Sequence, residues 1–227
     1  MENHNVSPFN ALPPVVVALA VVIFGLELMF QAATAGLLGG QSGIGWRLGA
    51  VESYGVLDQV WTWMVQTRQF PAEHLLRFAT YPLIHGGFIH MALVVVFILA
   101  LGKMVAEVYS ALAFVAVFWV SAVMGALGFV VLLDSPYPLI GGYPGVYGLI
   151  GAFTFLMWMR ADGQGSSRLR AFALIGALLA VQLIFALLNG DFGTVVADFS
   201  GFVAGLALSF VVSPGGWRRM VARMRQR

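Results

Sequence analysis

Six long apolar segments constrain the fold of this chain more than any other feature of its sequence. A membrane-spanning helix needs roughly 20 mostly apolar residues, because lipid cannot satisfy the hydrogen bonds of a backbone that is not helical. The segments that meet this requirement cover approximately residues 13–34, 88–107, 111–133, 144–160, 171–189 and 194–213. The sequence therefore predicts an all-α membrane protein in which residues 1–227 form a single domain with six transmembrane helices.

The composition supports the same fold class and excludes several kinds of function. Hydrophobic residues make up 60% of the chain and charged residues 10%, with a mean hydropathy of +0.89, whereas soluble domains are about half apolar and about a quarter charged. The absence of cysteine excludes disulfides, thiolate catalysis and cysteine metal sites. The net charge of +2 is too small to indicate nucleic-acid binding. We expect a lipid bilayer around the chain, no cofactor, no metal and no nucleic-acid partner.

The basic residues predict the orientation of the chain. With a cytoplasmic N-terminal segment 1–12, nine basic residues fall on the cytoplasmic side and three on the outer side. The nine are Lys103, Arg160, Arg168, Arg170, Arg218, Arg219, Arg223, Arg225 and Arg227, and the three are Arg47, Arg68 and Arg77. This bias fits the positive-inside rule. Both termini are therefore expected in the cytoplasm, with the basic tail 214–227 against anionic lipid headgroups.

The connection 35–87 between the first two apolar segments is too long for an ordinary loop, so it is expected to carry structure of its own. It is rich in aromatic side chains, namely Trp46, Tyr54, Trp61, Trp63, Phe70 and Phe78. Aromatic residues mixed with charges are typical of the membrane interface. We expect an ordered outer-face connection that rests partly in the outer leaflet, with Arg77 hydrogen-bonded to backbone carbonyls within it.

Small residues recur at helical spacing in three apolar segments. The pairs are Ser121 and Gly125, Gly148 and Gly151, and Gly201 and Gly205. Such residues let helix backbones approach closely in lipid, and the fourth segment, the shortest and richest in glycine, is predicted to lie at the centre of the bundle. The first segment carries Glu27, which is costly in hydrocarbon, so it is expected to face the bundle or lie near the outer interface.

Two histidines lie at the start of the second apolar segment, in LLRFATYPLIHGGFIHMALVVVFILALG, residues 75–102. Five-residue spacing rotates His85 and His90 about 140° apart on a helix, which is poor for joint metal ligation. We expect His85 to precede the helix and His90 to lie within it. Taken alone, the pair is equally compatible with two histidines that are simply hydrogen-bonded near the interface.

The surroundings of the two histidines resemble the rhomboid intramembrane serine proteases. Rhomboids carry an arginine eight residues before a His-Gly-Gly-x-x-His motif, and Arg77 stands at that distance from His85. The second histidine of the motif, here His90, helps to bind the oxyanion in active rhomboids. An asparagine usually follows it by four residues, and this chain has Val94 there.

A second segment, GGYPGVYGLIGA at residues 141–152, is similar to the start of the fourth rhomboid helix, G-A-S-G-A-I-Y-G-L-L-G-A. The serine of that motif is the nucleophile, and Tyr143 stands in its place, followed by Pro144 where the family has glycine. A shorter alignment would put the lost serine at Tyr147, but it leaves the tyrosine of the family unmatched. The residues that coincide include Gly141, Tyr147, Gly148, Gly151 and Ala152.

A third segment, GTVVADFSGFVAG at residues 193–205, resembles the last rhomboid helix. Rhomboids carry their general base there as G-x-x-x-A-H, with glycines three and seven residues after the histidine. This chain keeps Gly201 and Gly205 but has Asp198 at the histidine position. The resemblance, from about Arg77 to about Gly205, implies a six-transmembrane-helix rhomboid-like bundle with a long structured outer-face loop, in a bacterial inner membrane.

The three substitutions predict a rhomboid pseudoprotease. Peptide hydrolysis by this route needs an alkoxide-forming hydroxyl, a base and oxyanion donors. A phenol such as Tyr143 is a poor attacker of an amide, Asp198 cannot shuttle protons near neutral pH as imidazole does, and Val94 donates nothing. A relocated site would have to use a serine elsewhere, and those considered are Ser121, Ser135, Ser200 and Ser209.

Inactive branches of the family bind other membrane proteins and govern their trafficking, assembly or degradation. The resemblance therefore implies an adaptor, chaperone or assembly factor for an integral membrane protein. Two alternatives stay open: a fixed accessory subunit of a larger membrane complex, and a residual intramembrane serine protease.

The exchange of a small serine for Tyr143 and of a large histidine for Asp198 suggests what fills the site. A buried carboxylate needs a hydrogen-bond partner, and we predict that the Tyr143 hydroxyl donates to Asp198, directly or through one water, joining the fourth and sixth helices. His90 and Tyr147 are expected to line the same pocket. The alternative places Tyr143 outward at the headgroups and Asp198 against water.

Overall fold

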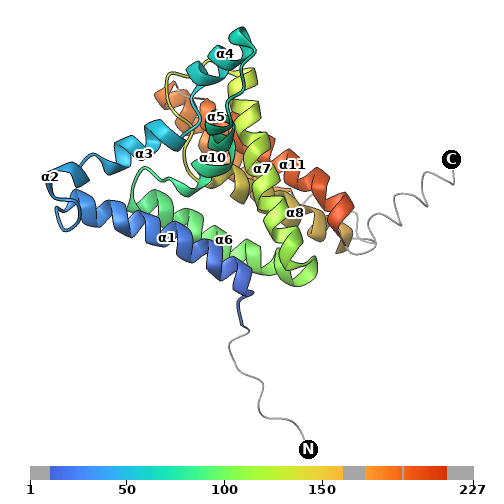
Figure 1. The fold of residues 1–227 in the computed structure, drawn as a ribbon. Helices are drawn as coiled ribbons and strands as arrows, with labels where there is room; N and C mark the ends of the chain where they lie inside the picture. The colour runs from blue at the N-terminus through green and yellow to red at the C-terminus, as the bar shows by residue number, and fades with distance from the viewer. Residues whose placement is uncertain (1–10, 161–171, 191, 214–227) are drawn as a thin grey trace, which may run out of the picture.

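The computed structural model describes residues 11–160, 172–190 and 192–213, and almost all of its regular structure is helical (Figure 1). Within these ranges β pairing is limited to one isolated bridge between Val56 and Leu139. Residues 1–10 and the tail 214–227, both predicted to be cytoplasmic, lie outside the described residues. The elements are α1 Pro14–Thr34, α2 Gly40–Gly43, α3 Trp46–Tyr54, α4 Asp58–Thr67, α5 Ala72–Thr80, η1 Tyr81–Leu83, α6 Phe88–Val108, α7 Ala111–Leu132, α8 Tyr143–Arg160, α10 Ala173–Asn189 and α11 Gly193–Val212.

Six of these helices, α1, α6, α7, α8, α10 and α11, lie where the six apolar segments predicted them. Their ends differ from the predicted ends by no more than two residues. Four of the six (α1, α6, α7 and α11) are long and apolar enough to cross a membrane, whereas α8 and α10 give shorter apolar helices. The chain is therefore an all-α, multi-pass membrane protein, and the count of six spans stays a prediction.

Helix α8 lies at the centre of the bundle, where it packs against α6, α7 and α11 (Figure 1). A Cβ atom on Gly205 would collide with the backbone of Gly148, and one on Gly201 would collide with the carbonyl group of Pro144. Backbone therefore meets backbone along the α8–α11 contact, as expected where lipid gives no hydrophobic drive for helix association. Both the central place of α8 and the role of these small residues are confirmed.

The same close approach joins α7 to the two central helices. Ser121 fills the space that a side chain at Gly148 would need, and a Cβ atom on Gly125 would lie 2.5 Å from Cβ of Pro144 and 2.8 Å from the carbonyl oxygen of Ala197. Helices α7, α8 and α11 thus form one tightly packed group, and we call their small-residue contacts the glycine seam.

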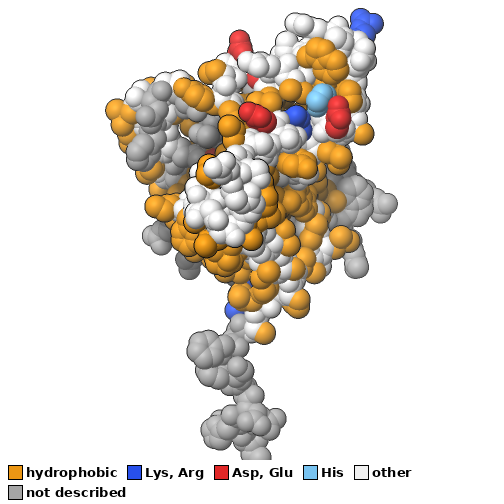
Figure 2. Space-filling model, turned by 60° about the vertical axis from the view of Figure 1, so that its left-hand side comes forward, with side chains coloured by type: hydrophobic (Ala, Val, Ile, Leu, Met, Phe, Trp, Pro, Cys, Tyr) orange, Lys and Arg blue, Asp and Glu red, His pale blue; other side chains and the backbone are white. Residues whose placement is uncertain are grey.

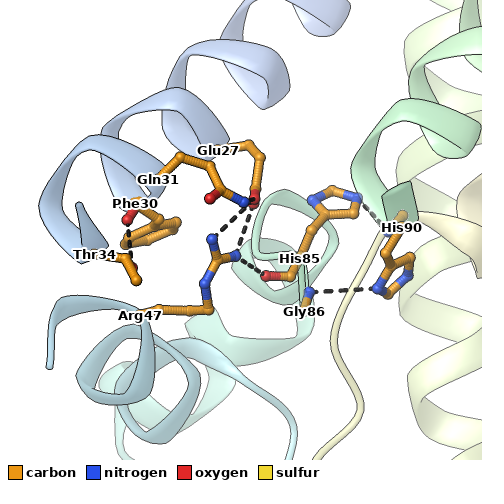
Figure 3. A network of polar contacts seen from close by, with 9 residues as sticks. Glu27, Phe30, Gln31, Thr34, Arg47, His85, Gly86 and His90 are labelled. Atoms are coloured by element: carbon orange, nitrogen blue, oxygen red, sulfur yellow. Dashed lines mark hydrogen bonds and ion pairs between the residues drawn. The ribbon is translucent and has the colours of Figure 1, made fainter. Parts of the chain in front are cut away.

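The buried charge of α1 is neutralised by the connection 35–87. Glu27 is 1% exposed, and its two carboxylate oxygens each accept a 2.8 Å hydrogen bond from Arg47 of α3 (Figure 3). Gln31 donates to the same carboxylate at 2.8 Å, and Arg47 also donates to the carbonyl oxygen of His85 at 2.6 Å. The expectation that Glu27 faces the bundle is confirmed, and its partner ties α1 to the segment that precedes α6.

The connection 35–87 is ordered, as expected from its aromatic content. It consists of α2 to α5 and η1, and Nη1 of Arg77 donates to the carbonyl oxygens of Glu52, at 2.6 Å, and Gly55, at 2.9 Å. The predicted hydrogen bonding of Arg77 to carbonyls within the connection is confirmed. Figure 2 shows charged side chains gathered at the top of the molecule, over a body covered mainly by hydrophobic side chains.

Replacing Arg77 by lysine should loosen the connection without unfolding the bundle. Both carbonyls accept from the same nitrogen, Nη1. The lysine ammonium ends a shorter side chain and would leave at least one of them without its charged donor, and each lost charged hydrogen bond costs about 1.5 to 3 kcal/mol. We expect amides of residues 49–56 to exchange at least about tenfold faster in Arg77→Lys, measured by hydrogen exchange in nanodiscs. Arg68→Lys, an exposed arginine of the same connection, is the control. Equal exchange in both variants would contradict this role.

Candidate functional site

The two histidines lie beside the backbone that leads into α8. His85 precedes α6 and His90 lies in its first turn, as expected. The Nε2 atom of His85 accepts the backbone N–H of Gly142 at 3.4 Å, and Nδ1 of His90 accepts the N–H of Gly86 at 3.3 Å. The rings meet edge to face, with centroids 5.1 Å apart. Within the described residues no group of three or more His, Cys, Asp or Glu side chains is placed to hold a metal ion.

Gly141 is required where the chain passes the histidines. Its φ of +92° lies in the left-handed region, which side chains avoid, and a Cβ atom there would lie 2.5 Å from Nε2 of His90. A Cβ atom on Gly142 would lie 2.9 Å from a methyl group of Val94. Glycines therefore let this segment lie against His90 and Val94, immediately before α8 begins at Tyr143.

A pocket of about 430 Å³ opens beside this segment, walled by α6, α8, α10, α11 and the residues that precede α8. Tyr143 stands at its wall, and its ring stacks on His90 with centroids 5.2 Å apart and planes 14° apart. The residues of the wall that bear on function are His90, Tyr143, Pro144, Gln182, Thr194 and Asp198. The sequence correctly placed Tyr143, Pro144, His90 and Asp198 around one site.

The direct hydrogen bond predicted between Tyr143 and Asp198 is absent, and a link through one water stays a prediction. Asp198 is 1% exposed, and its Oδ2 atom accepts instead from Nε2 of Gln182, at 2.5 Å. Gln182 of α10 reaches the Asp198 carboxylate, whereas the Tyr143 ring lies flat on His90. The polar link therefore joins α10 to α11 rather than α8 to α11. A glutamine inside an otherwise apolar helix was the available signal, since polar residues in membrane helices usually face a partner.

Tyr147 was expected in the same pocket, and this too is wrong. It is buried among the apolar side chains of the main core instead. One helical turn separates it from Tyr143, so its ring lies deeper along α8 than the pocket reaches. The other glycines that carry the resemblance, Gly148, Gly151 and Gly201, lie in the helix contacts and not in the pocket.

The serines considered for a relocated site lie elsewhere among the described residues. Ser121 is fully buried against α8, and Ser200 fills the space beside Gly128. The hydroxyl of Ser209 donates to the carbonyl oxygen of Gly205, and that of Ser135 contacts Tyr137 in the loop after α7. None of the four lines the pocket that contains His90.

The buried imidazole of His85 makes stability depend on pH. Burial, followed by the neighbouring His90, lowers the pKa of His85 from 6.5 to about 4. Between these two pKa values the unfolded chain binds a proton that the folded chain does not bind. The free energy of unfolding therefore falls as the pH falls through this range. The linkage relation gives a loss of about 2 kcal/mol between about pH 7 and pH 5.

This loss can be assigned to His85 by comparing melting temperatures in detergent at the two pH values. In His85→Gln, where the amide oxygen can still accept from Gly142, the pH dependence should be smaller by about 2 kcal/mol. His74→Gln, on α5 beside Trp63, should keep the full dependence. An unchanged pH dependence in His85→Gln would show that other groups cause it.

Comparison with known proteins agrees with the motifs. The family model described as the Rhomboid domain matches residues 72–215, a range that includes the histidine segment, the start of α8 and the first half of α11. A comparison with curated proteins gives no match. The matched range covers more than half of the chain and all three motifs, and on that basis this chain belongs to the rhomboid family.

Proposed function

We propose that the chain is a catalytically inactive rhomboid that binds other integral membrane proteins as an adaptor, chaperone or assembly factor. It would cross a bacterial inner membrane six times, with both termini in the cytoplasm. The observation that carries the proposal is the set of residues around the pocket, where a tyrosine and an aspartate stand beside His90 and no serine is found among the described wall residues.

The contacts of these residues support the absence of hydrolysis. The ring of Tyr143 lies flat on His90, and a phenolate attacks amides poorly. The Asp198 carboxylate is engaged with Gln182, which has no proton of suitable pKa to exchange. Val94 is fully buried and meets Gly142 with a methyl group, so it offers no donor to an oxyanion.

The surface beside the pocket supports a binding role. Helix α10 packs mainly against α11, and its other side exposes large apolar side chains, among them Val181, Leu183, Ile184, Leu187 and Leu188. A partner helix in the membrane can lie along such a face, because lipid and apolar side chains are interchangeable neighbours. The same helix contributes Gln182 to the wall of the pocket.

The absence of hydrolysis is tested with a fluorophosphonate probe and a model transmembrane substrate, with an active rhomboid as positive control. We expect neither labelling nor cleavage by the unmodified protein. The double variant Tyr143→Ser with Asp198→His should also stay inactive, because Val94 and Pro144 leave the oxyanion site incomplete. Robust cleavage by the unmodified protein would refute the proposal.

Binding is tested by affinity purification in mild detergent followed by mass spectrometry. An adaptor should recover several membrane proteins at low stoichiometry. Recovery of one partner at fixed stoichiometry would instead identify an accessory subunit of a larger complex, and recovery of no membrane protein would count against both.

A further inference from the structure

The pair formed by Asp198 and Gln182 has acceptor atoms left over. The amide nitrogen of Gln182 donates to Oδ2 of Asp198, whereas Oδ1 of Asp198 and Oε1 of Gln182 have no hydrogen-bond partner among the described residues. Asp198 is 1% exposed, and unpaired polar atoms at such a depth are costly. The two free atoms are both acceptors when the carboxylate is ionised, so only a donor can satisfy them.

The two residues line the pocket between α10 and α11, and the described residues supply no cation there. The wall contains Thr194 and His90 but no lysine or arginine. Among the described residues, Arg47 is engaged with Glu27 on the side of α1 (Figure 3). A cationic donor that enters this pocket would therefore meet two unpaired acceptor atoms and, among the described wall residues, no lysine or arginine to repel it.

The size and place of the pocket limit how a donor can arrive. A helix is about 10 Å across, so a volume of about 430 Å³ admits a long side chain but not a helix. Asp198 is the sixth residue of α11, which places it about 7.5 Å along the axis from the start of that helix. The pocket wall also includes Ile89 of α6, which is 76% exposed, and Gln182 of α10, so a second helix that packs beside α6 and α10 could extend a side chain inward.

Resting on the proposed function, we propose that the pocket selects partner membrane helices that carry an arginine or lysine about one and a half turns from the end of their span. The guanidinium or ammonium group would donate to Oδ1 of Asp198, and an arginine could also donate to Oε1 of Gln182. A basic residue inside a lipid-facing helix is itself costly, by about 2.5 to 3.5 kcal/mol on insertion scales. Binding at Asp198 therefore satisfies the unpaired acceptors of the pocket and the basic side chain of the partner helix in the same contact.

The test uses the full-length protein in nanodiscs and synthetic single-span peptides of about 21 leucine and alanine residues. The sixth residue of each peptide is arginine, lysine, glutamine, leucine or glutamate. Because the chain has no cysteine, Tyr137→Cys, at an exposed position in the loop after α7, accepts one donor dye for energy-transfer measurements. We expect the arginine and lysine peptides to bind at least about tenfold more tightly than the leucine peptide.

Two variants should abolish this preference. Asp198→Asn removes the charge at constant size, and Thr194→Lys places a cation four residues before Asp198, on the same face of α11. Glu52→Gln, which removes an exposed carboxylate of α3, is the matched control and should keep the preference. The Thr194→Lys variant leaves the Asp198–Gln182 pair in place, so it remains informative if Asp198→Asn fails to fold.

The outcomes separate this inference from the function on which it rests. Equal binding of the arginine, glutamine and leucine peptides would overturn the selectivity and leave the adaptor role intact. A preference for arginine that survives in both pocket variants would also overturn it, because Asp198 would not be the selecting group. Binding of no peptide would overturn the inference and count against the adaptor role as well.

Discussion

Arg47→Met is expected to lower the free energy of unfolding by about 3 to 5 kcal/mol, the usual cost of removing one partner of a buried ion pair. The carboxylate of Glu27 is 1% exposed and receives two hydrogen bonds from Arg47. Methionine keeps an apolar stem near the Phe30 ring, over which the guanidinium now lies at 5.3 Å, so the variant removes charge more than packing. Thermal melting in detergent measures the loss.

A second substitution in the same protein separates charge from packing in this prediction. Adding Glu27→Gln to Arg47→Met should recover most of the lost stability, because the neutral amide no longer needs a cation and Gln31 remains beside it. Arg68→Met, at an exposed position, should change stability by less than about 0.5 kcal/mol. If the double variant is as unstable as Arg47→Met, the unpaired carboxylate is not the cause.

Gly205→Ala should cost about 3 kcal/mol or prevent folding, at the upper end of what overpacking usually costs. The added Cβ atom would collide with the carbonyl oxygen, Cα and carbonyl carbon of Gly148. All three are backbone atoms, so no side chain can rotate away and α8 and α11 would have to separate. The measurement is the melting temperature and the yield of folded protein in detergent.

Gly25→Ala is the matched control for the glycine seam. Gly25 also lies within a membrane helix, but a Cβ atom there would meet nothing within 4 Å. Alanine is about 1 kcal/mol better than glycine in a helix interior, so Gly25→Ala should be neutral or stabilising. Equal behaviour of the two variants would mean that the α8–α11 contact can relax.

The helices could be predicted from the sequence because their ends depend on the length of apolar segments, which membrane thickness dictates. The glycine seam could be predicted as well, because small residues at helical spacing in membrane helices typically mark a close helix–helix contact. Arg77 and its carbonyl partners followed from the need to satisfy a charged side chain inside an ordered connection. These are local requirements that can be stated without knowing the three-dimensional arrangement.

The partners of the buried charges could not be predicted in this way. Glu27 was expected to face the bundle or lie near the outer interface, but its pairing with Arg47 depends on how α3 lies against α1. The pairing of Asp198 with Gln182 depends on the rotation of α10 about its own axis, which an apolar pattern leaves almost undetermined. The stacking of Tyr143 on His90 likewise depends on how the chain enters α8, where Gly141 has a φ of +92°.

The glycine seam has a consequence for how proteins of this shape diverge. Where Gly205 meets Gly148, neither residue can become smaller and the atoms opposite are backbone, so a mutation on one helix has no compensating mutation on the other. Positions around the pocket face a volume of about 430 Å³, so a side chain there can change size without moving a backbone. We therefore expect substitutions to be tolerated more readily around the pocket than along the seam.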